Sequence, residues 1–272
     1  MLQMSEVDIS DLVTLHAGHS TVGFVDFERG TPKPYGSGTL ISFGILKGIL
    51  TCAHVADAIH KRREVGIVVF CRDGRRPQGL KVKVTECHST ILRGSDPMKG
   101  PDLAFILLPA ATAEQLSAYA TFTNGLNRRR EAQESEPECD EAFAVVVGGV
   151  AEWTSTSETV ERSITTMGAL SNVGAFKTSP GADGYDFFEF FAHPERNFRM
   201  PKSYHGVSGG GLWKFYLKSA RGGGFDVVQA RLVGVAFYQT DAGTILCHGP
   251  RSVYHDLYGR LHSMSLAAAQ ST

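Results

Sequence analysis

The chain lacks the features that direct a protein to nucleic acid or into a membrane. Its 27 Lys and Arg residues are balanced by 28 Asp and Glu residues, which gives a formal net charge of −1. Such a balance predicts neither nucleic acid nor an anionic membrane surface as the main partner. No apolar run approaches the ~18 residues of a membrane-spanning helix. The longest candidates, Leu103–Leu108 and Ala142–Val147, have the length of strands.

The N-terminus also lacks the signs of export. Residues Met1–Asp11 include three acids and show neither the basic start nor the apolar stretch of a secretory signal. We therefore expect a cytoplasmic protein.

Cysteine is scarce, and no two cysteines form a C-x-x-C pair. An odd number without such spacing predicts neither a disulfide framework nor a zinc site, so reduced and mostly buried thiols are expected. The histidines outside the motifs described below show no H-E-x-x-H spacing. We expect no metal and no cofactor. The cysteines are Cys52, Cys71, Cys87, Cys139 and Cys247, and these histidines include His193, His205, His248 and His255.

Patterns typical of β-strands dominate the sequence. Short β-rich runs are separated by Gly, Pro or charged clusters, and no repeating strand–helix–strand pattern occurs. A barrel or sandwich is therefore favoured over a parallel α/β sheet. The runs are Ser20–Phe27, Gly36–Ser42, Gly48–Cys52, Gly66–Phe70, Leu80–His88, Leu103–Leu108, Ala142–Gly148, Thr159–Met167, Tyr185–Phe191, Gly211–Leu217, Val227–Tyr238 and Thr244–His248. Helices are expected at Ala56–Glu64, Ala113–Tyr119 and Tyr254–Leu266.

The middle of the chain differs in composition. Three arginines within Asn127–Arg130 are followed by six acids within Glu131–Glu141. This pattern favours an exposed connection between two halves. A regulatory or self-cleavage loop is the alternative, because an exposed arginine cluster would be accessible.

Three short motifs follow one another along the chain. The first, Ile49–Val55 (ILTCAHV), is an apolar strand that leads into His54. The second, Asp102–Leu108 (DLAFILL), is an apolar strand opened by an acid. The third places Ser208 in the glycine loop Gly206–Gly211 (GVSGGG).

Each of these residue types has a chemical role. A serine hydroxyl is a poor nucleophile until a base takes its proton. Histidine titrates near neutrality, so it can take that proton and return it to a leaving group. A carboxylate on the second ring nitrogen fixes the tautomer and stabilises the imidazolium. Glycines around the serine let the backbone aim N–H groups at the developing oxyanion, and here the donors would be those of Gly206 and Ser208.

The motifs TCAHV, DLAFILL and GVSGG resemble the three signatures of the trypsin-like (chymotrypsin-fold) serine peptidases, in that family's order of His, Asp and Ser. Gly36–Ile41 (GSGTLI) is similar to the family's segment before the histidine. Leu232–Tyr238 (LVGVAFY) is similar to the strand that lines its specificity pocket. The resemblance extends from about Val13 to Tyr254.

The resemblance implies an all-β fold with two antiparallel β-barrels of the chymotrypsin type and a C-terminal helix. Residues 13–112 would form the barrel carrying the histidine and the aspartate, and residues 113–141 a charged connecting loop. Residues 142–272 would form the barrel carrying the serine, followed by the terminal helix. The implied activity is that of a serine endopeptidase working through an acyl-enzyme on a polypeptide substrate. Its catalytic residues would be His54, Asp102 and Ser208.

The G-x-S-x-G pattern also fits the nucleophile elbow of α/β-hydrolases, which requires the acid and the histidine to follow the serine. Little chain remains after the serine, and the preceding strands lack helical crossovers, so the chymotrypsin type is favoured. The acids and histidines that do follow are Asp226, Asp241, Asp256, His248 and His255.

One position departs from the digestive members of the family. They carry an Asp before the serine, which pairs with a new N-terminal amine after zymogen cleavage. Here the residue is Val207, and no I-V-G-G-like start is present. We expect an oxyanion loop that is ready-made or ordered by an activating protein partner, without N-terminal trimming.

Substrate specificity is less determined. From their position relative to the serine, we expect Lys202 near the pocket base and His205 on its rim. We expect His248 and Arg251 to approach the pocket from the last strand. A basic pocket would favour an acidic residue before the cleaved bond. The alternative is that these side chains face solvent or pair with nearby acids.

The substrate backbone is expected to add as a strand along Phe237–Gln239, with Phe237 and Tyr238 in contact with it. Two rival functions are open: a catalytically idle family member that serves as a binding or scaffold module, and a serine hydrolase that acts on esters. An intact triad argues against the first.

Overall fold

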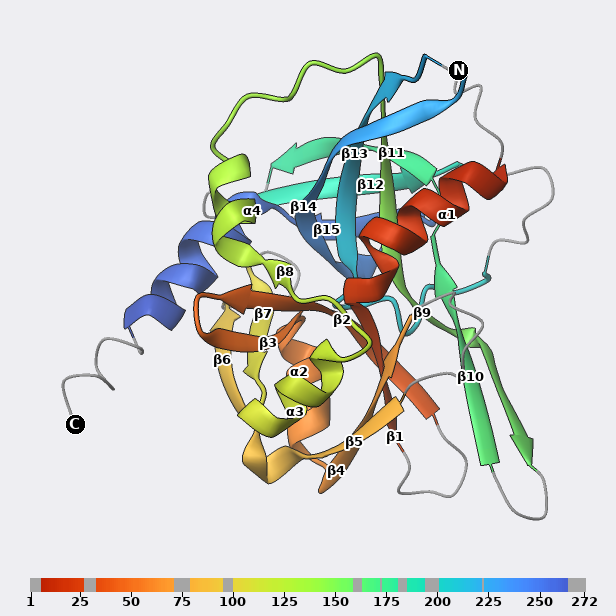
Figure 1. Ribbon diagram of the computed structural model, residues 1–272. Coiled ribbons are helices and arrows are strands. Elements are labelled where there is room, and N and C mark those ends of the chain that lie inside the picture. The colour runs from red at the N-terminus through yellow and green to blue at the C-terminus, as the bar shows by residue number, and fades with distance from the viewer. Residues whose placement is uncertain are drawn as a thin grey trace.

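The computed structural model describes residues 6–26, 33–70, 79–94, 100–158, 163–171, 173–180, 185–193, 201–221 and 223–263. These residues form two β-sheets, one from each half of the chain, with a few helices around them (Figure 1). The coarse prediction of a mostly β protein with a C-terminal helix is confirmed. Among the described helices, none has both the length and the apolar character that crossing a membrane would require.

The first sheet runs in the order β5-β4-β1-β2-β3-β7-β6, and the short strand β8 pairs in parallel with β2. The two ends of this path are neighbours in the chain, because only the 3-10 turn η2 (Val84–Glu86) and Cys87 separate β5 from β6. The sheet therefore curls until its two edges meet at one stretch of backbone. The strands are β1 (Thr21–Asp26), β2 (Lys33–Phe43), β3 (Leu46–Thr51), β4 (Glu64–Val69), β5 (Gly79–Lys83), β6 (His88–Arg93), β7 (Asp102–Leu107) and β8 (Thr123–Asn124).

The second sheet runs in the order β10-β9-β11-β12-β15-β14-β13, and β9 pairs additionally with β13. Six of its strands thus pair in a circle that begins and ends at β9, and β10 extends the long strand β9 outside that circle. Closure of this kind removes exposed sheet edges. The strands are β9 (Glu141–Glu158), β10 (Ser163–Leu170), β11 (Val173–Pro180), β12 (Asp186–Ala192), β13 (Gly211–Ser219), β14 (Phe225–Gln239) and β15 (Ile245–His248).

Strands β3 and β7 bring the first two motifs together. They pair antiparallel, with Thr51 opposite Ala104, so the residues just after β3 lie beside the start of β7. Every residue of β7 except the last is buried, as expected for an apolar run covered on both faces. The core packed around these strands also includes side chains of the second sheet such as Trp213 and Phe215, so the two halves share one hydrophobic cluster.

The helices agree with the sequence expectations in part. Helix α2 (Ala53–His60) starts three residues before the predicted Ala56–Glu64, and α3 (Ala110–Ser117) overlaps the predicted Ala113–Tyr119. Residues 250–263 form the C-terminal helix, whose turns over Ser252–Leu257 are π-helical (η4). Helix α1 (Glu6–His16) and strand β11 were not predicted. Part of the predicted strand Thr159–Met167 lies outside the described residues.

The exposed connection predicted over Asn127–Arg130 and Glu131–Glu141 is a loop only in part, because Gly125–Glu131 forms helix α4. Residues 132–140 lie outside helices and strands and are mostly exposed, as predicted. The Asn124 side chain caps this helix by accepting from the backbone N–H of Asn127 at 3.0 Å. Arg128 pairs with Glu131 at 2.7 Å and also donates to the carbonyl of Ala230 in β14. Arg128 therefore fastens the start of the connection to the second sheet.

The acidic stretch that follows is held through its backbone. Arg231 of β14 is only 7% exposed. Its guanidinium donates to the carbonyls of Glu131, Glu134 and Ser135 at 2.8, 3.3 and 3.0 Å. The number of charged residues in the sequence could not predict these hydrogen bonds of Arg231, because the acceptors are main-chain oxygens.

Candidate active site

His54 and Asp102 form a hydrogen-bonded pair at the junction of β3 and α2. His54 is the second residue of α2, where backbone N–H groups have no partner within the helix. Its N–H donates to Asp102 Oδ1 at 2.9 Å, and its Nδ1 lies 2.5 Å from Asp102 Oδ2. The two contacts fix the ring and leave Nε2 as the ring nitrogen available to a substrate. The imidazole is half exposed, whereas the carboxylate is 9% exposed.

Asp102 is ionised despite its burial. Burial opposes the charged form, but the hydrogen bonds and charge of His54 outweigh it, so the pKa of Asp102 is lowered. An ionised carboxylate accepts from both donors of His54. The proton of the neutral imidazole therefore sits on Nδ1, and Nε2 is free to act as a base.

His248 lies behind this pair, on the side away from solvent. It is fully buried on β15, and its Nε2 accepts the backbone N–H of Asp102 at 3.2 Å. Its ring stacks on that of Phe237, with 4.1 Å between the ring centroids. Burial lowers the pKa of His248 to about 3, so this second histidine is neutral at physiological pH. Sequence reasoning placed His248 at the specificity pocket, but its ring is enclosed in the protein.

Ser208 sits in a tight loop whose shape requires glycine. Gly206 and Gly209 have φ values of +96° and +90°, in the left-handed region that disfavours other residues. A Cβ at Gly209 would also collide with the carbonyl oxygen of Ser37 and the hydroxyl of Thr51. The loop thus packs directly against β2 and β3 of the other sheet.

Ser37 of β2 makes three hydrogen bonds across this junction. Its hydroxyl donates to the carbonyl of Gly206 at 2.6 Å and accepts from the N–H of Gly149 at 2.7 Å. Its backbone N–H donates to the carbonyl of Ser208 at 2.8 Å. The Thr51 hydroxyl in turn donates to the Ser37 carbonyl at 2.6 Å. A fully buried residue of the first sheet therefore holds both ends of the serine segment.

The loop leaves two backbone donors without protein acceptors. Within the described part of the chain, the N–H groups of Gly206 and Ser208 donate to no protein atom. The next two are engaged, since Gly209 donates to Ala236 at 2.7 Å and Gly210 donates to Val207 at 2.8 Å. A pair of free N–H groups beside a serine can receive a developing oxyanion.

Val207 is 2% exposed and packs in the apolar cluster of the second sheet. A Cβ added at Gly148 would lie 3.2 Å from its Cγ1. The loop is thus anchored by burial of this side chain and by the hydroxyl of Ser37.

One cleft of about 640 Å³ contains His54, Asp102 and Ser208. In the described structure, the Ser208 hydroxyl donates to the carbonyl of Phe237 at 3.4 Å, not to His54. Hydrogen bonds between a nucleophile and its base are commonly long or poorly aligned before substrate binds. The residues that line the cleft are His54, Asp57, Arg93, Asp102, Ser203, Tyr204, His205, Ser208, Phe237, Tyr238 and Gln239.

The predicted pocket residues divide into two groups. His205, Phe237 and Tyr238 line the cleft. Lys202 does not, and its backbone N–H donates to Glu152 at 2.8 Å. Arg251 is exposed elsewhere, with its backbone N–H donating to Asp186 at 2.7 Å.

Sequence reasoning missed four residues of the lining: Asp57, Arg93, Ser203 and Tyr204. Asp57 could have been found, because on a helix it follows His54 at i+3 and shares its face. Its carboxylate pairs with Arg93 of β6 at 2.6 Å. Nothing in the sequence signals that second residue.

Cys52 completes a compact group with His54 and Asp102, whose potential metal-ligand atoms lie within 4.8 Å of one another. The group is a poor donor set. Burial, followed by the charge of Asp102, raises the pKa of the Cys52 thiol well above its usual value. The thiol donates to the carbonyl of Ala236 at 3.1 Å, and only a thiolate is a strong ligand. Cys87, Cys139 and Cys247 are also free thiols, and Cys71 lies outside the described residues.

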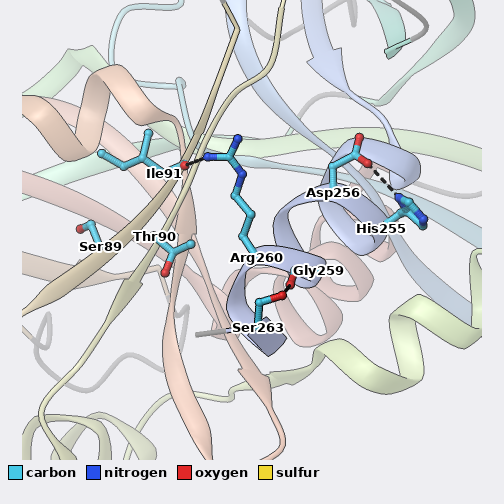
Figure 2. Close-up of a pocket in the computed structure, with 8 residues that line it drawn as sticks. All are labelled: Ser89, Thr90, Ile91, His255, Asp256, Gly259, Arg260 and Ser263. Carbon is cyan, nitrogen blue, oxygen red and sulfur yellow. Dashed lines mark hydrogen bonds and ion pairs between the residues drawn. The ribbon is translucent and has the colours of Figure 1, made fainter. Parts of the chain in front are cut away.

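A second cavity, of about 690 Å³, lies away from this site, between β6 and the C-terminal helix. Figure 2 shows Arg260 reaching across it to the carbonyl of Ile91, at 2.8 Å. Among the described strands, β6 pairs only with β7, so its other edge faces this cavity. Arg260 covers one of the open carbonyls, which is a way to protect an edge strand.

Comparison with known proteins gives a weak match. No protein-family model matches the chain. No curated protein matches it either. Among solved structures, the chain is similar to an HtrA-type protease, AlgW, solved with a decapeptide, at 15% identity and a TM-score of 0.42. The match covers 90% of this chain and 64% of that one.

Proposed function

We propose that the chain is a serine endopeptidase of the chymotrypsin type, in which His54, Asp102 and Ser208 form the catalytic triad. The observation that carries the proposal is the pairing of His54 Nδ1 with the buried Asp102 carboxylate at 2.5 Å, in the same cleft as Ser208. The two curled sheets support it, because the first provides the base and the acid and the second provides the nucleophile. Two barrels meeting at such a site are the architecture that the sequence motifs imply.

The reaction follows from the groups present. His54 Nε2 takes the Ser208 proton while the serine oxygen bonds to the substrate carbonyl carbon. The carbonyl oxygen gains negative charge and accepts from the N–H groups of Gly206 and Ser208. The protonated ring then delivers its proton to the leaving amine, which gives an acyl-enzyme. Water, deprotonated by the same nitrogen, releases the acid product and restores the serine.

A polypeptide substrate is supported by the edge of β14. The pairing of β13 with β14 ends at Gly211 opposite Val235, whereas β15 continues to pair with Tyr238 and Gln239. One edge of residues 237–239 therefore lacks a strand neighbour among the described residues and lies along the cleft. An extended peptide can add there as a strand, which supplies sequence-independent backbone hydrogen bonds.

The oxyanion loop is proposed to be ready-made. The hydrogen bonds of Ser37 and the burial of the Val207 side chain hold the oxyanion loop in place. In a zymogen-derived enzyme, a charge pair with a new N-terminus holds that loop. The intact chain is therefore expected to be active without processing. Of the four basic residues expected near the specificity pocket, His205 alone lines the cleft. A preference for acidic residues before the cleaved bond would consequently depend on that side chain.

The test is labelling with a fluorophosphonate probe, followed by peptide cleavage. The wild-type chain should be labelled at Ser208 and should cleave casein, and Ser208→Ala should do neither. Ser263→Ala, which changes a serine on the C-terminal helix, is the matched control and should retain both activities. Absence of labelling in the wild type would identify an idle binding module. Labelling without peptide cleavage would identify an esterase.

A further inference from the structure

We propose that His248 is a positioning residue that holds the acid of the triad and the wall beside the nucleophile in one arrangement. This inference rests on the function proposed above. It concerns a histidine outside the triad that does not line the cleft.

The first contact of His248 is with the acid. Its Nε2 accepts the backbone N–H of Asp102 at 3.2 Å, although the two residues are 146 positions apart. The Asp102 side chain then binds His54 through both of its oxygens. The second sheet thus fixes the backbone from which the orienting carboxylate projects.

The second contact is with the wall of the cleft. The His248 ring stacks on Phe237 at 4.1 Å with 19° between the planes, and Phe187 packs against it edge-on at 5.3 Å. The carbonyl of Phe237 is the group that the Ser208 hydroxyl contacts at 3.4 Å. One side chain therefore touches both the acid and the strand beside the nucleophile.

The chemistry of the contact requires a neutral ring. A nitrogen that accepts a hydrogen bond carries no proton, so the proton of His248 is on Nδ1. Among the described residues this Nδ1 has no partner, although it is fully buried. An unsatisfied buried donor is a cost that a simple packing residue would avoid, since an apolar ring of similar size carries none. The titratable groups that bear on this ring are Asp102 of β7 and His54 of α2.

The positioning role of His248 is tested by comparing three variants of the whole chain. His248→Phe keeps the ring and removes the acceptor. His248→Gln keeps an acceptor and removes the stacking. His248→Ala removes both. Loss of the acceptor should lower kcat about tenfold with little change in KM, and the glutamine variant should recover much of the loss. The alanine variant should be the least active and the least stable.

A spectroscopic readout keeps the test independent of turnover. In the ¹⁵N-histidine NMR spectrum of the wild type, His248 should stay neutral with its proton on Nδ1 from pH 4.5 to 8. The downfield Nδ1–H signal of His54, which reports its bond to Asp102, should weaken or shift in His248→Phe. A His248 that titrates near neutrality, or a phenylalanine variant with an unchanged His54 signal, would overturn the inference. A wild type without serine-dependent hydrolysis would refute the proposed function and leave the NMR result to decide the role of His248.

Discussion

Ser37 and Gly206 are 169 residues apart in the chain, and the hydroxyl of the first donates to the carbonyl of the second at 2.6 Å. This contact joins the first sheet to the loop that carries the nucleophile. Because Ser37 is fully buried, its hydrogen bonds are not weakened by competition with water.

Replacing Ser37 by Ala should impair catalysis and stability together. The change leaves the carbonyl of Gly206 and the N–H of Gly149 buried without their partner, which costs about 1–3 kcal/mol of unfolding free energy. A loosened oxyanion loop should lower kcat/KM by roughly 10- to 100-fold. Urea unfolding and peptide hydrolysis measure the two effects.

Thr39→Val is the matched control for this variant. Thr39 lies two residues along the same strand, and its hydroxyl is buried without a hydrogen-bond partner among the described residues. Its removal should leave activity unchanged and stability equal or slightly higher. Equal losses in the two variants would mean that any buried polar change in β2 disturbs the site, and the specific role of Ser37 would be rejected.

Asp102→Asn should abolish most activity while the fold persists. The amide can still accept from the backbone N–H of His54, but it presents an NH₂ group where the imidazole needs an acceptor, so the ring is held in the wrong tautomer. The corresponding change in the chymotrypsin template lowers kcat by roughly 10⁴-fold. Steady-state hydrolysis at pH 7 measures it.

Asp57→Asn provides the comparison, since it alters a second carboxylate of the same cleft that pairs with Arg93 and not with His54. It should change kcat by less than about tenfold. If the two variants lost kcat equally, the orienting role of Asp102 would be rejected.

Stability should fall as the pH is lowered from 6.5, because of His248. Its folded-state pKa is about 3, below the usual value of 6.5. Between these values the unfolded chain binds a proton that the native chain does not, so protonation favours unfolding. Above pH 6.5 this group does not change the free energy of unfolding. As the pH falls toward 3, the free energy of unfolding declines progressively by an amount on the order of a few kcal/mol.

Urea midpoints at pH 7.5 and 4.5 would measure this decline, and His248→Phe is the reference. The variant lacks the titrating group, so its midpoint should depend less on pH than that of the wild type. Identical pH dependence in the two proteins would contradict the prediction.

Val207→Asp should inactivate the protein instead of creating a zymogen-like switch. The side chain is 2% exposed in an apolar cluster, and a carboxylate there would lose its hydration without a charged partner. The expected result is a loss of several kcal/mol of unfolding free energy and of oxyanion-loop order, measured by thermal unfolding and fluorophosphonate labelling. Val207→Ile, a hydrophobic change, should remain labelled. An active Asp variant would show that the loop is ordered by something other than its apolar anchor.

The local patterns of the sequence were enough to predict most strands and the candidate catalytic residues. Apolar runs bounded by Gly and charged clusters identified most strands, since a strand covered on both faces must be apolar along its length. The three motifs also identified His54, Asp102 and Ser208 as the groups to examine, because each chemistry restricts the residue types that can perform it.

The tertiary structure alone decided which distant groups meet. Helix α4 was not predicted, because its arginine side chain at Arg128 donates to a main-chain oxygen of another segment. Every residue type carries such an oxygen, so the amino-acid composition cannot indicate which one will be the acceptor. Ser37 and His248 were not recognised as supports of the site for a related reason. Their partners are backbone atoms 169 and 146 residues away, and only sheet closure and strand register bring such atoms within hydrogen-bonding distance.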